Sequence, residues 1–315
     1  YPDFLGRSLC ALEAVETAVI VVSAVNGVEP MTQRMMDFAK ARGLCRLIVV
    51  NKIDAREART EAVLTEIREI FGKACLPLNL PSDGGRSVVD CFFQPHGKAT
   101  DFSTVEAAHT EIIDQVVEVD EQLMALYLEQ GEEIAPEQLH DPFEQALRED
   151  HLVPICFCSA ETGAGIPELQ QVLLRLMPNP AEGNAPPFLK GEGPDAARVT
   201  VAPDPARHVI AHVFKVTIDP FVGKLGIFRV HQGTVRSGAQ LYVGDARKPI
   251  KLAHLYQLQG KEHVEIAQGI PGDICAVPKI DELHFDAVLH DSHDEDHYHL
   301  KSVNFPPPML GVAIR

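Results

Sequence analysis

The feature that most constrains the fold is a set of continuous apolar runs that recur along the chain. They read "TAVIVVSAV" at residues 17–25, "CRLIVVNKID" at residues 45–54 and "LVPICFCSA" at residues 152–160. Unbroken runs rich in β-branched residues are typical of parallel strands that are buried on both faces. We therefore expect three buried parallel strands.

Helix-patterned segments follow each of these runs. Residues 29–43 carry Pro30 in the expected first turn and end at Gly43, and residues 55–72 also end in Gly. Pro favours the start of a helix and Gly its end. A third helix is expected from about residue 166 to residue 176. This alternation of strands and helices predicts a doubly wound α/β domain.

Residues 73–151 interrupt the alternation and predict an inserted α+β subdomain. Residues 73–93 resemble two short strands joined by a turn at residues 83–85. The rest of the block is acidic and helix-patterned, with helices expected near residues 105–117, 119–130 and 136–148. The simplest interpretation of its acidic residues is that they form the solvated faces of these helices.

The second half of the chain has a different pattern. Residues 181–206 are rich in Pro and Gly and lack periodicity, which predicts a linker. Residues 207–304 contain short alternating runs separated by Gly-containing turns, and this pattern predicts an all-β barrel. Lys224 and Arg229 in this segment could contact RNA phosphates or could be ordinary surface charges.

Composition limits the classes of protein to consider. The 315 residues are 45% hydrophobic and 23% charged, as in soluble globular proteins, and the apolar runs are far shorter than a membrane span, so we expect no membrane association. A net charge of −17 disfavours non-specific binding to nucleic acid. Seven cysteines without a pairing framework favour reduced, buried thiols and a cytoplasmic protein, with Cys156 and Cys158 as packing residues.

The second apolar run ends in "NKID", an Asn-Lys-x-Asp pattern that can hold a guanine base. The carboxylate of Asp54 can accept hydrogen bonds from both N1–H and the N2 amine of guanine. Adenine lacks this pair of donors and would leave the carboxylate unpaired. Asn51 can bridge the loop and the base edge, and the stem of Lys52 can lie along the purine. The alternative is a strand-to-helix turn in which Asp54 caps the next helix.

A second segment, "SAETGAG" at residues 159–165, follows the third apolar run. Here the backbone N–H of Ala160 can donate to guanine O6, while Ser159 steadies the loop and Asp54. The alternative is an ordinary capped turn, because Ser, Thr and Gly favour turns. Both segments follow strand ends, where open α/β sheets bind ligands. Ser159 lies 105 residues after Asp54. A single connecting helix would need far fewer residues between the two segments, and the inserted block accounts for the additional length.

The sequence contains no Gly-x-x-x-x-Gly-Lys-Ser/Thr segment, which is the loop that holds nucleotide phosphates. The chain also begins with Tyr1 rather than Met. We therefore expect a piece of a longer protein, with the phosphate loop upstream. By itself this piece is expected to carry no bound nucleotide and to be inactive.

The order of these motifs resembles elongation factor G and its close relatives. The resemblance rests on Asn-Lys-x-Asp, the insert with "PLNLPSDG", Ser-Ala-x-Thr-Gly-x-Gly, the Pro-rich linker and the barrel. The barrel segment "FKVTIDPFVGKLGIFRVHQGTVRSGAQLYV" at residues 214–243 is the strongest match, and residues 26–36 and 305–314 also resemble family segments. The similarity covers essentially the whole chain and implies a translational GTPase.

The resemblance also implies a domain division and a set of partners. Residues 1–72 and 152–180 would form part of the GTP-binding domain, residues 207–304 the second domain, and residues 305–315 the start of the third. The intact protein would bind GTP or GDP with Mg²⁺. It would act as a monomer on the ribosome, where it would contact ribosomal RNA and stalk proteins.

One position departs from the family pattern. Family members have a His at the place of Tyr1, and that His positions the water that attacks GTP. A phenol with a pKa of about 10 cannot act in the same way. Two alternatives to an efficient GTPase therefore stay open: a weakly hydrolysing guanine-nucleotide switch and a ribosome-protection factor. The segment "DFLG" fits the magnesium-associated Asp-x-x-Gly pattern, but we expect Asp3 to start a helix rather than to bind magnesium.

Residues 283–299 are rich in His and acidic residues. His297 and His299 could reach one metal ion from the same face of a strand, because imidazole and carboxylate are common metal ligands. The alternative is a solvated loop of the barrel. We assign no metal ligand from the sequence.

Overall fold

The computed structural model describes residues 4–97, 99–130, 138–184, 186–219 and 223–305. The chain divides into two compact units. The first, called here the α/β unit, comprises Glu16–Pro178 with Glu182–Asn184. The second, called the barrel unit, comprises the described residues before Glu16, Asn179–Ala181 and the described residues from Pro186 onward. Among the described helices, none combines the length and apolar character that a membrane span requires.

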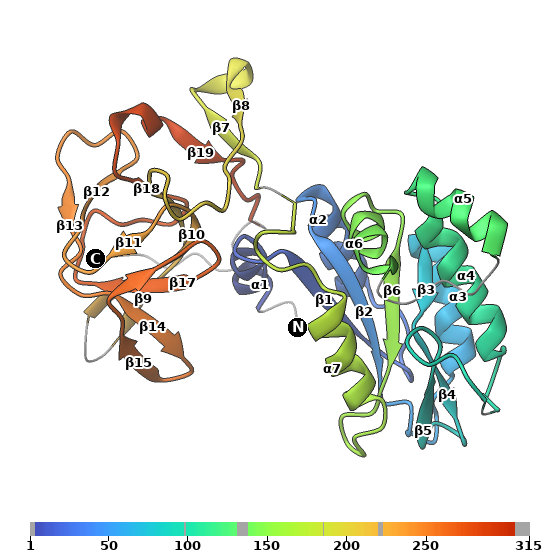
Figure 1. Ribbon diagram of the computed structural model, residues 1–315. Helices are drawn as coiled ribbons and strands as arrows, with labels where there is room; N and C mark the ends of the chain where they lie inside the picture. The colour runs from blue at the N-terminus through green and yellow to red at the C-terminus, as the bar shows by residue number, and fades with distance from the viewer. Residues whose placement is uncertain (1–3, 98, 131–137, 185, 220–222, 306–315) are drawn as a thin grey trace. The chain divides into compact units, whose positions relative to one another are not determined.

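A parallel sheet forms the centre of the α/β unit (Figure 1). Its strands stand in the order β1 (Thr17–Ser23), β2 (Cys45–Asn51), β6 (Val153–Phe157) and β3 (Cys75–Pro77). Val50 in β2 lies opposite Val22 in β1 and Phe157 in β6. Helices follow the three expected strands, namely α2 (Pro30–Ala41), α3 (Thr60–Phe71) and α7 (Ile166–Arg175). The predicted α/β class is confirmed.

The prediction that β1 is buried on both faces is wrong. Val19 and Val21 are 44% and 61% exposed, whereas Ala18 and Val22 are buried. The reason is position: β1 is an edge strand that pairs only with β2 in the described sheet, and α2 packs against it. Strand β2 has a neighbour on each side and is buried at every position before Asn51. An apolar run does not by itself reveal whether its strand is central or at the edge.

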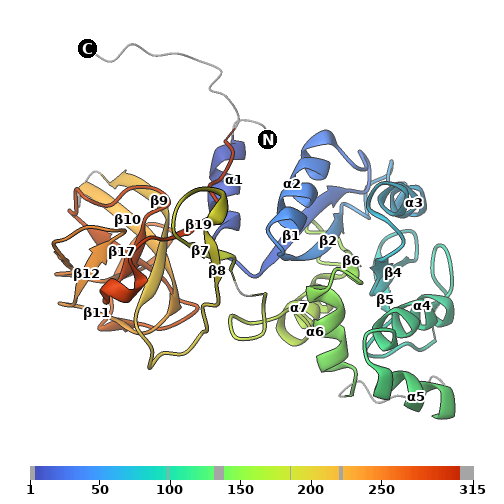
Figure 2. The same cartoon turned by 90° about the horizontal axis from the view of Figure 1, so that it is seen from above.

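The inserted block forms a hairpin and three helices. Strands β4 (Asn79–Ser82) and β5 (Ser87–Asp90) pair antiparallel around the expected turn. The helices, close to their expected ranges, are α4 (Val105–Val117), α5 (Glu121–Gln130) and α6 (His140–Arg148). The third helix was expected to begin at residue 136, but residues 136 and 137 lie outside the described residues. Figures 1 and 2 show β4, β5, α4 and α5 on the side of the sheet away from β1.

The start of the insert belongs to the main sheet. Strand β3 pairs parallel with β6, so the sheet gains a fourth strand that the sequence pattern did not predict. Only three residues form this strand, too few for a recognisable pattern.

The barrel unit is built on an eight-stranded antiparallel sheet that curves as a half-barrel, which confirms the predicted all-β class. The order in the sheet is β13 (Ile250–Lys251), β12 (Gln240–Val243), β18 (Val288–His290), β9 (Ile210–Asp219), β10 (Gly223–Gln232), β17 (Ile274–Pro278), β14 (Tyr256–Gln259) and β15 (Glu262–Glu265). Strands β11 (Val235–Arg236) and β16 (Gln268–Gly269) form a separate pair.

Two segments of the barrel unit differ from expectation. The expected linker contains strands β7 (Phe188–Lys190) and β8 (Ala197–Val199), which form a small sheet with β19 (Tyr298–Leu300). Helix α1 (Leu5–Leu12), expected in the GTP-binding domain, groups with the barrel unit. The division into functional domains stays a prediction.

Arg229 has a structural role in the barrel unit. Its side chain is buried, and its Nη1 donates to the backbone oxygen of Ala14 at 2.9 Å. Lys224 donates through Nζ to the oxygen of Asp281 at 2.6 Å. Arg229 is therefore neither an exposed RNA contact nor an ordinary surface charge, whereas Lys224 stays at the surface and its two interpretations stay open.

The predicted burial of the cysteines holds for all but Cys10, which is partly exposed. All seven cysteines are free and six are buried. Burial raises the pKa of Cys45 and Cys75 to about 11, so these thiols stay protonated at neutral pH. Cys156 and Cys158 lie in the core of the α/β unit, as packing residues do.

The buried side chain of Asn79 joins the insert to the main sheet. Its Nδ2 donates to the backbone oxygen of Phe157 at 3.1 Å, and its Oδ1 accepts from the backbone nitrogen of Phe157 at 2.7 Å. Phe157 is the last residue of β6. The contact therefore fixes the hairpin beside the loop that begins at Cys158.

We predict that Asn79→Ala lowers the free energy of unfolding of the α/β unit by about 2–6 kcal/mol, because it leaves two buried backbone groups of Phe157 without a partner, each at a cost of about 1–3 kcal/mol. Urea unfolding followed by helical circular dichroism measures this, since α2 to α7 belong to the α/β unit. Asn184→Ala is the matched control: its exposed Nδ2 donates to Gly43 and Arg148 oxygens at 2.8 and 3.0 Å, and water can replace it. Equal losses in the two variants would contradict the prediction.

Candidate guanine-nucleotide site

The two sequence motifs meet at the carboxyl-terminal edge of the parallel sheet. Asn51 is the last residue of β2, and Ser159 follows the last residue of β6 by two positions. Because β2 and β6 are adjacent and parallel, their following loops start side by side. The pairing brings together residues that lie more than a hundred positions apart in the sequence.

The Asn51 carboxamide connects the two loops. Its Oδ1 accepts from the backbone nitrogens of Lys52 at 2.7 Å and Ala160 at 3.0 Å. The Cys158 Sγ lies 3.9 Å from the same oxygen. Burial raises the pKa of Cys158, so the thiol is protonated at neutral pH and can donate to Asn51. One oxygen therefore organises both halves of the candidate site.

The backbone turns sharply at Lys52. Its φ of 67° lies in the left-handed region, which a residue with a side chain adopts at a cost of about 1–2 kcal/mol. The turn ends β2 and directs Ile53 into the core, where it is buried. The Ile53 nitrogen then donates to the Cys158 oxygen at 3.4 Å, a second link between the loops. The Lys52 side chain is left on the exposed side.

Asp54 does not cap the following helix. Helix α3 begins at Thr60, and its cap residue is Arg59, so the alternative interpretation of Asp54 is wrong. The intervening residues form a turn with an Ala58-to-Ala55 backbone bond, which delays the helix. Asp54 is partly exposed, and no hydrogen bond or ion pair engages its carboxylate within the described part of the chain. The carboxylate is thus free to accept bonds from a ligand.

Ser159 and Ala160 have different surroundings. Ser159 is fully buried, and its Oγ accepts from the Thr162 nitrogen at 3.1 Å, as in an ordinary Ser turn. The expected support of Asp54 by Ser159 is absent from the hydrogen bonds of the described residues. Ala160 is exposed, and its N–H points at Asn51 rather than at open solvent. A guanine O6 would have to share or replace that bond.

Sequence reasoning missed the residues that support the Asn-Lys-x-Asp loop from the insert. Gly85 packs so closely on the loop that an added Cβ would overlap the oxygen of Ile53. Asp101 holds the hairpin turn in this position by accepting from the nitrogens of Gly84 and Gly85, both at 2.9 Å. The Asp-Gly-Gly turn was recognisable in the sequence, but its contact with residues 53 and 54 was not.

Arg59 supports the site from the other side. Its Nε and Nη2 donate to the oxygens of Val25 and Asn26 at 3.2 and 3.0 Å, and its backbone nitrogen donates to Ala24. The loop after β1 is thereby tied to the start of α3. Tyr1 and Asp3, the two residues considered for catalysis and magnesium, lie outside the described residues.

Two family models match the chain. The model of the elongation factor Tu GTP-binding domain matches residues 1–179, and that of elongation factor G domain 2 matches residues 208–290. The first match covers more than half of the chain and includes both candidate loops.

The relatives agree with these models. Proteins described as "Elongation factor G-like protein" from two Mycobacterium tuberculosis strains, CDC 1551 / Oshkosh and ATCC 25618 / H37Rv, are 30% identical over 342 aligned residues, covering 100% of this chain and 47% of each relative. A crystal structure of a Thermus thermophilus protein superposes with a TM-score of 0.76 at 29% identity, covering 98% of this chain and 46% of that chain. The chain thus spans about half the length of the relatives it matches.

The chain belongs to the family of translational GTPases that share the elongation factor Tu GTP-binding domain, and within it to the elongation factor G-like members.

We predict that Gly85→Ala destabilises the α/β unit by about 2–4 kcal/mol, since it adds an overlap with Ile53 to the strain of a positive φ. Gly84→Ala is the control: its φ is also positive, but an added Cβ meets nothing within 4 Å, so about 1 kcal/mol is expected. The amides of Lys52 and Ala160 should exchange hydrogen faster in Gly85→Ala than in the unmodified chain, and this change should not occur in Gly84→Ala. Urea unfolding and amide exchange measure the two effects, and identical behaviour of the variants would rule out the contact.

Proposed function

We propose that this chain supplies the guanine-recognising part and the barrel of a GTP-hydrolysing translation factor that acts on the ribosome. The observation that carries the proposal is the bond from the Ala160 amide to Asn51 Oδ1, which joins the two loops proposed to hold guanine. The site residues proposed are Asn51, Lys52, Asp54, Ser159 and Ala160.

The free groups suit a guanine base. The unengaged carboxylate of Asp54 can accept from N1–H and the N2 amine, and the exposed stem of Lys52 can cover one purine face. The Ala160 N–H is not free, because it donates to Asn51 Oδ1; it is the donor proposed for O6, which would share or replace that bond. Ser159 acts indirectly, by shaping the loop through its bond to the Thr162 nitrogen. With adenine, the Asp54 carboxylate would face the acceptor N1 instead of a donor, so adenine binding is disfavoured.

The phosphates and Mg²⁺ would need residues other than these. The sequence has no phosphate-loop motif, so we propose that a further segment of a longer protein holds the triphosphate. Within the described residues, β1 has no second pairing strand and Val19 and Val21 are exposed, which supports this proposal because additional strands could pair and pack there. Bound Mg²⁺ would neutralise developing charge on the phosphates.

Action on the ribosome, with ribosomal RNA and stalk protein as partners, is proposed from family membership, as are a monomeric state and a cytoplasmic location. Tyr1 supports a second candidate function, a guanine-nucleotide switch that occupies the ribosome and hydrolyses GTP weakly. A phenol is a poor substitute for the family His in positioning water. The remaining alternative, a ribosome-protection factor, would use the same site to bind a guanine nucleotide.

We predict that this 315-residue chain binds GTP weakly or not at all and hydrolyses none, and that it still distinguishes guanosine from adenosine. In millimolar titrations followed by NMR, guanosine should shift the amides near Asp54 and Ala160, and adenosine should not. Asp54→Asn should lose the guanosine response and gain one to xanthosine, whose O2 accepts from the new amide. Asp83→Asn, an exposed turn residue, is the control.

Micromolar GTP affinity by calorimetry would contradict the first part of this prediction. An unchanged response of Asp54→Asn to guanosine would remove the proposed base contact.

A longer protein that contains this chain and a phosphate loop should hydrolyse GTP faster with ribosomes than without them. Steady-state phosphate release measures both rates. Tyr1→His should raise the ribosome-stimulated rate by at least about tenfold if the phenol limits water positioning, in line with the usual contribution of general base groups. A rate that ribosomes do not change would support the weakly hydrolysing switch instead.

A further inference from the structure

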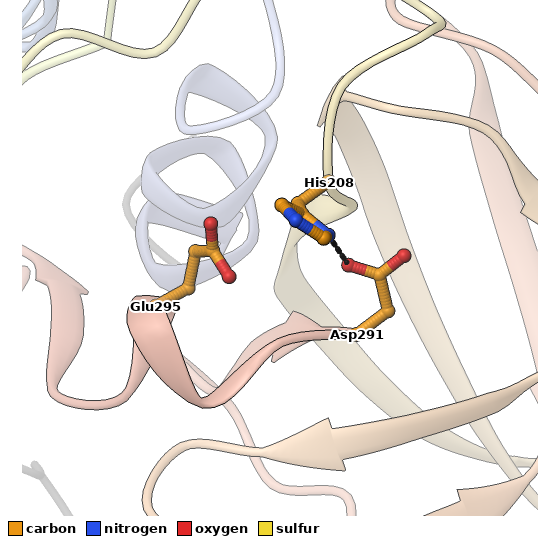
Figure 3. Close-up of side chains that lie close together, drawn as sticks. All are labelled: His208, Asp291 and Glu295. Atoms are coloured by element: carbon orange, nitrogen blue, oxygen red, sulfur yellow. Dashed lines mark hydrogen bonds and ion pairs between the residues drawn. The ribbon is translucent and has the colours of Figure 1, made fainter.

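The barrel unit gathers three potential metal-ligating side chains from two segments, the residues before β9 and the stretch after β18 (Figure 3). His208 lies just before β9, Asp291 directly follows β18, and Glu295 ends a short 3₁₀ turn at His293–Glu295. One ligand atom of each residue lies within 4.8 Å of the others. The pairing of β9 with β18, which sets His290 opposite Ile210, brings the first two residues together.

Asp291 and His208 are already oriented toward each other. The Asp291 Oδ1 lies 3.1 Å from the His208 Nδ1 and accepts from the backbone nitrogen of Val209 at 2.9 Å. The backbone bond fixes the carboxylate, as outer hydrogen bonds commonly do for metal ligands. Both side chains stay partly open to solvent, which leaves a route for an ion.

Glu295 carries the strongest indication of a missing ligand. The residue is only 8% exposed, and its Oε2 is buried without a hydrogen-bond partner among the described residues. A buried, unpaired carboxylate is costly, so such groups are normally paired or bound to metal. Figure 3 shows its carboxylate facing the His208 ring. The turn that presents it is closed by the Ser292 Oγ, which accepts from the Asp294 nitrogen at 3.2 Å.

Two other histidines of this segment, His290 and His299, are engaged by backbone oxygens. Both ring nitrogens of His290 face backbone oxygens, those of Ser292 and Gly244, and both of His299 face the oxygens of Leu300 and Gly191. The pair His297 and His299, considered from the sequence, is therefore not the group that converges in the described residues. His208, which lies outside the His-rich segment, takes their place.

We propose that His208, Asp291 and Glu295 form a binding site for a divalent transition-metal ion, with zinc as the best-suited ion. One imidazole and two carboxylates match the nitrogen and oxygen ligands of zinc, whereas a site for Mg²⁺ or Ca²⁺ would use oxygen ligands alone. Three protein ligands leave a position for water. The ion neutralises two carboxylates, one of which is buried.

The ion would act as a clamp on the barrel unit. Ligand distances of about 2.0–2.2 Å to zinc require the ligand atoms to lie about 3–3.5 Å apart, so the present spacing closes by roughly 1 Å. Rotation of the Glu295 and His208 side chains supplies this movement. The bound ion would tie the start of β9 to the turn after β18 and stabilise the folded unit by mass action.

The test is calorimetric titration of the metal-stripped full chain with ZnCl₂, in the presence of millimolar Mg²⁺. One site is expected, with affinity reduced at least about tenfold in His208→Gln and in Glu295→Gln. His254→Gln is the matched control, because the exposed His254 also pairs with a carboxylate, that of Glu265 at 2.8 Å, and should leave binding unchanged. Zinc should also raise the unfolding temperature of the wild type and of His254→Gln.

Circular dichroism and the melting temperature without metal confirm that each variant folds. Glu295→Gln is nearly isosteric, so loss of zinc binding in a folded variant reports on the ligand. Absence of zinc binding, equal binding in all variants, or displacement by Mg²⁺ would each overturn the site.

Discussion

The structure around the candidate site depends on the Asn51 carboxamide oxygen. It accepts from the amides of Lys52 and Ala160 and so holds together the two loops that leave β2 and β6. Parallel strand pairing brings the loops close, but only this oxygen and the Ile53-to-Cys158 backbone bond fix them to each other among the hydrogen bonds of the described residues. The left-handed backbone at Lys52 is maintained because both neighbours are held: Asn51 in the sheet and Ile53 in the core. The Asp54 carboxylate is consequently presented without an internal partner in the described part of the chain.

The inserted block supports this arrangement instead of disturbing it. Its first strand extends the parallel sheet beyond β6, and Asn79 satisfies both backbone groups of Phe157 at the end of β6. Its hairpin turn, held by Asp101, packs Gly85 against the backbone of Ile53. An insertion between two halves of a ligand site can thus serve as a brace, because β3 pairs with β6 and the hairpin turn packs against the loop after β2.

The barrel unit follows the same principle on an antiparallel sheet. Pairing of β9 with β18 juxtaposes His208 and Asp291, and the following turn adds Glu295. The density of His and acidic residues in the sequence pointed to this region, yet His290 and His299 bond to backbone oxygens. Similarly, Arg229 turns inward to the Ala14 oxygen rather than outward. Side-chain chemistry alone does not tell which polar groups the fold leaves available.

The sequence by itself determined the class of the fold, the positions of most helices, the all-β character of the second half and the two loop motifs, because hydrophobic periodicity, glycine at helix ends and short motifs are local properties of the chain. It also indicated the family through motif order. Only the tertiary structure decided that β1 is an edge strand, that β3 joins the main sheet and that Asp54 is free rather than a helix cap. It alone placed Asn79, Gly85 and Asp101 beside the site and selected His208, Asp291 and Glu295 from many candidates. These outcomes depend on which strands pair and which segments pack together, and such long-range contacts leave no periodic signal in the chain.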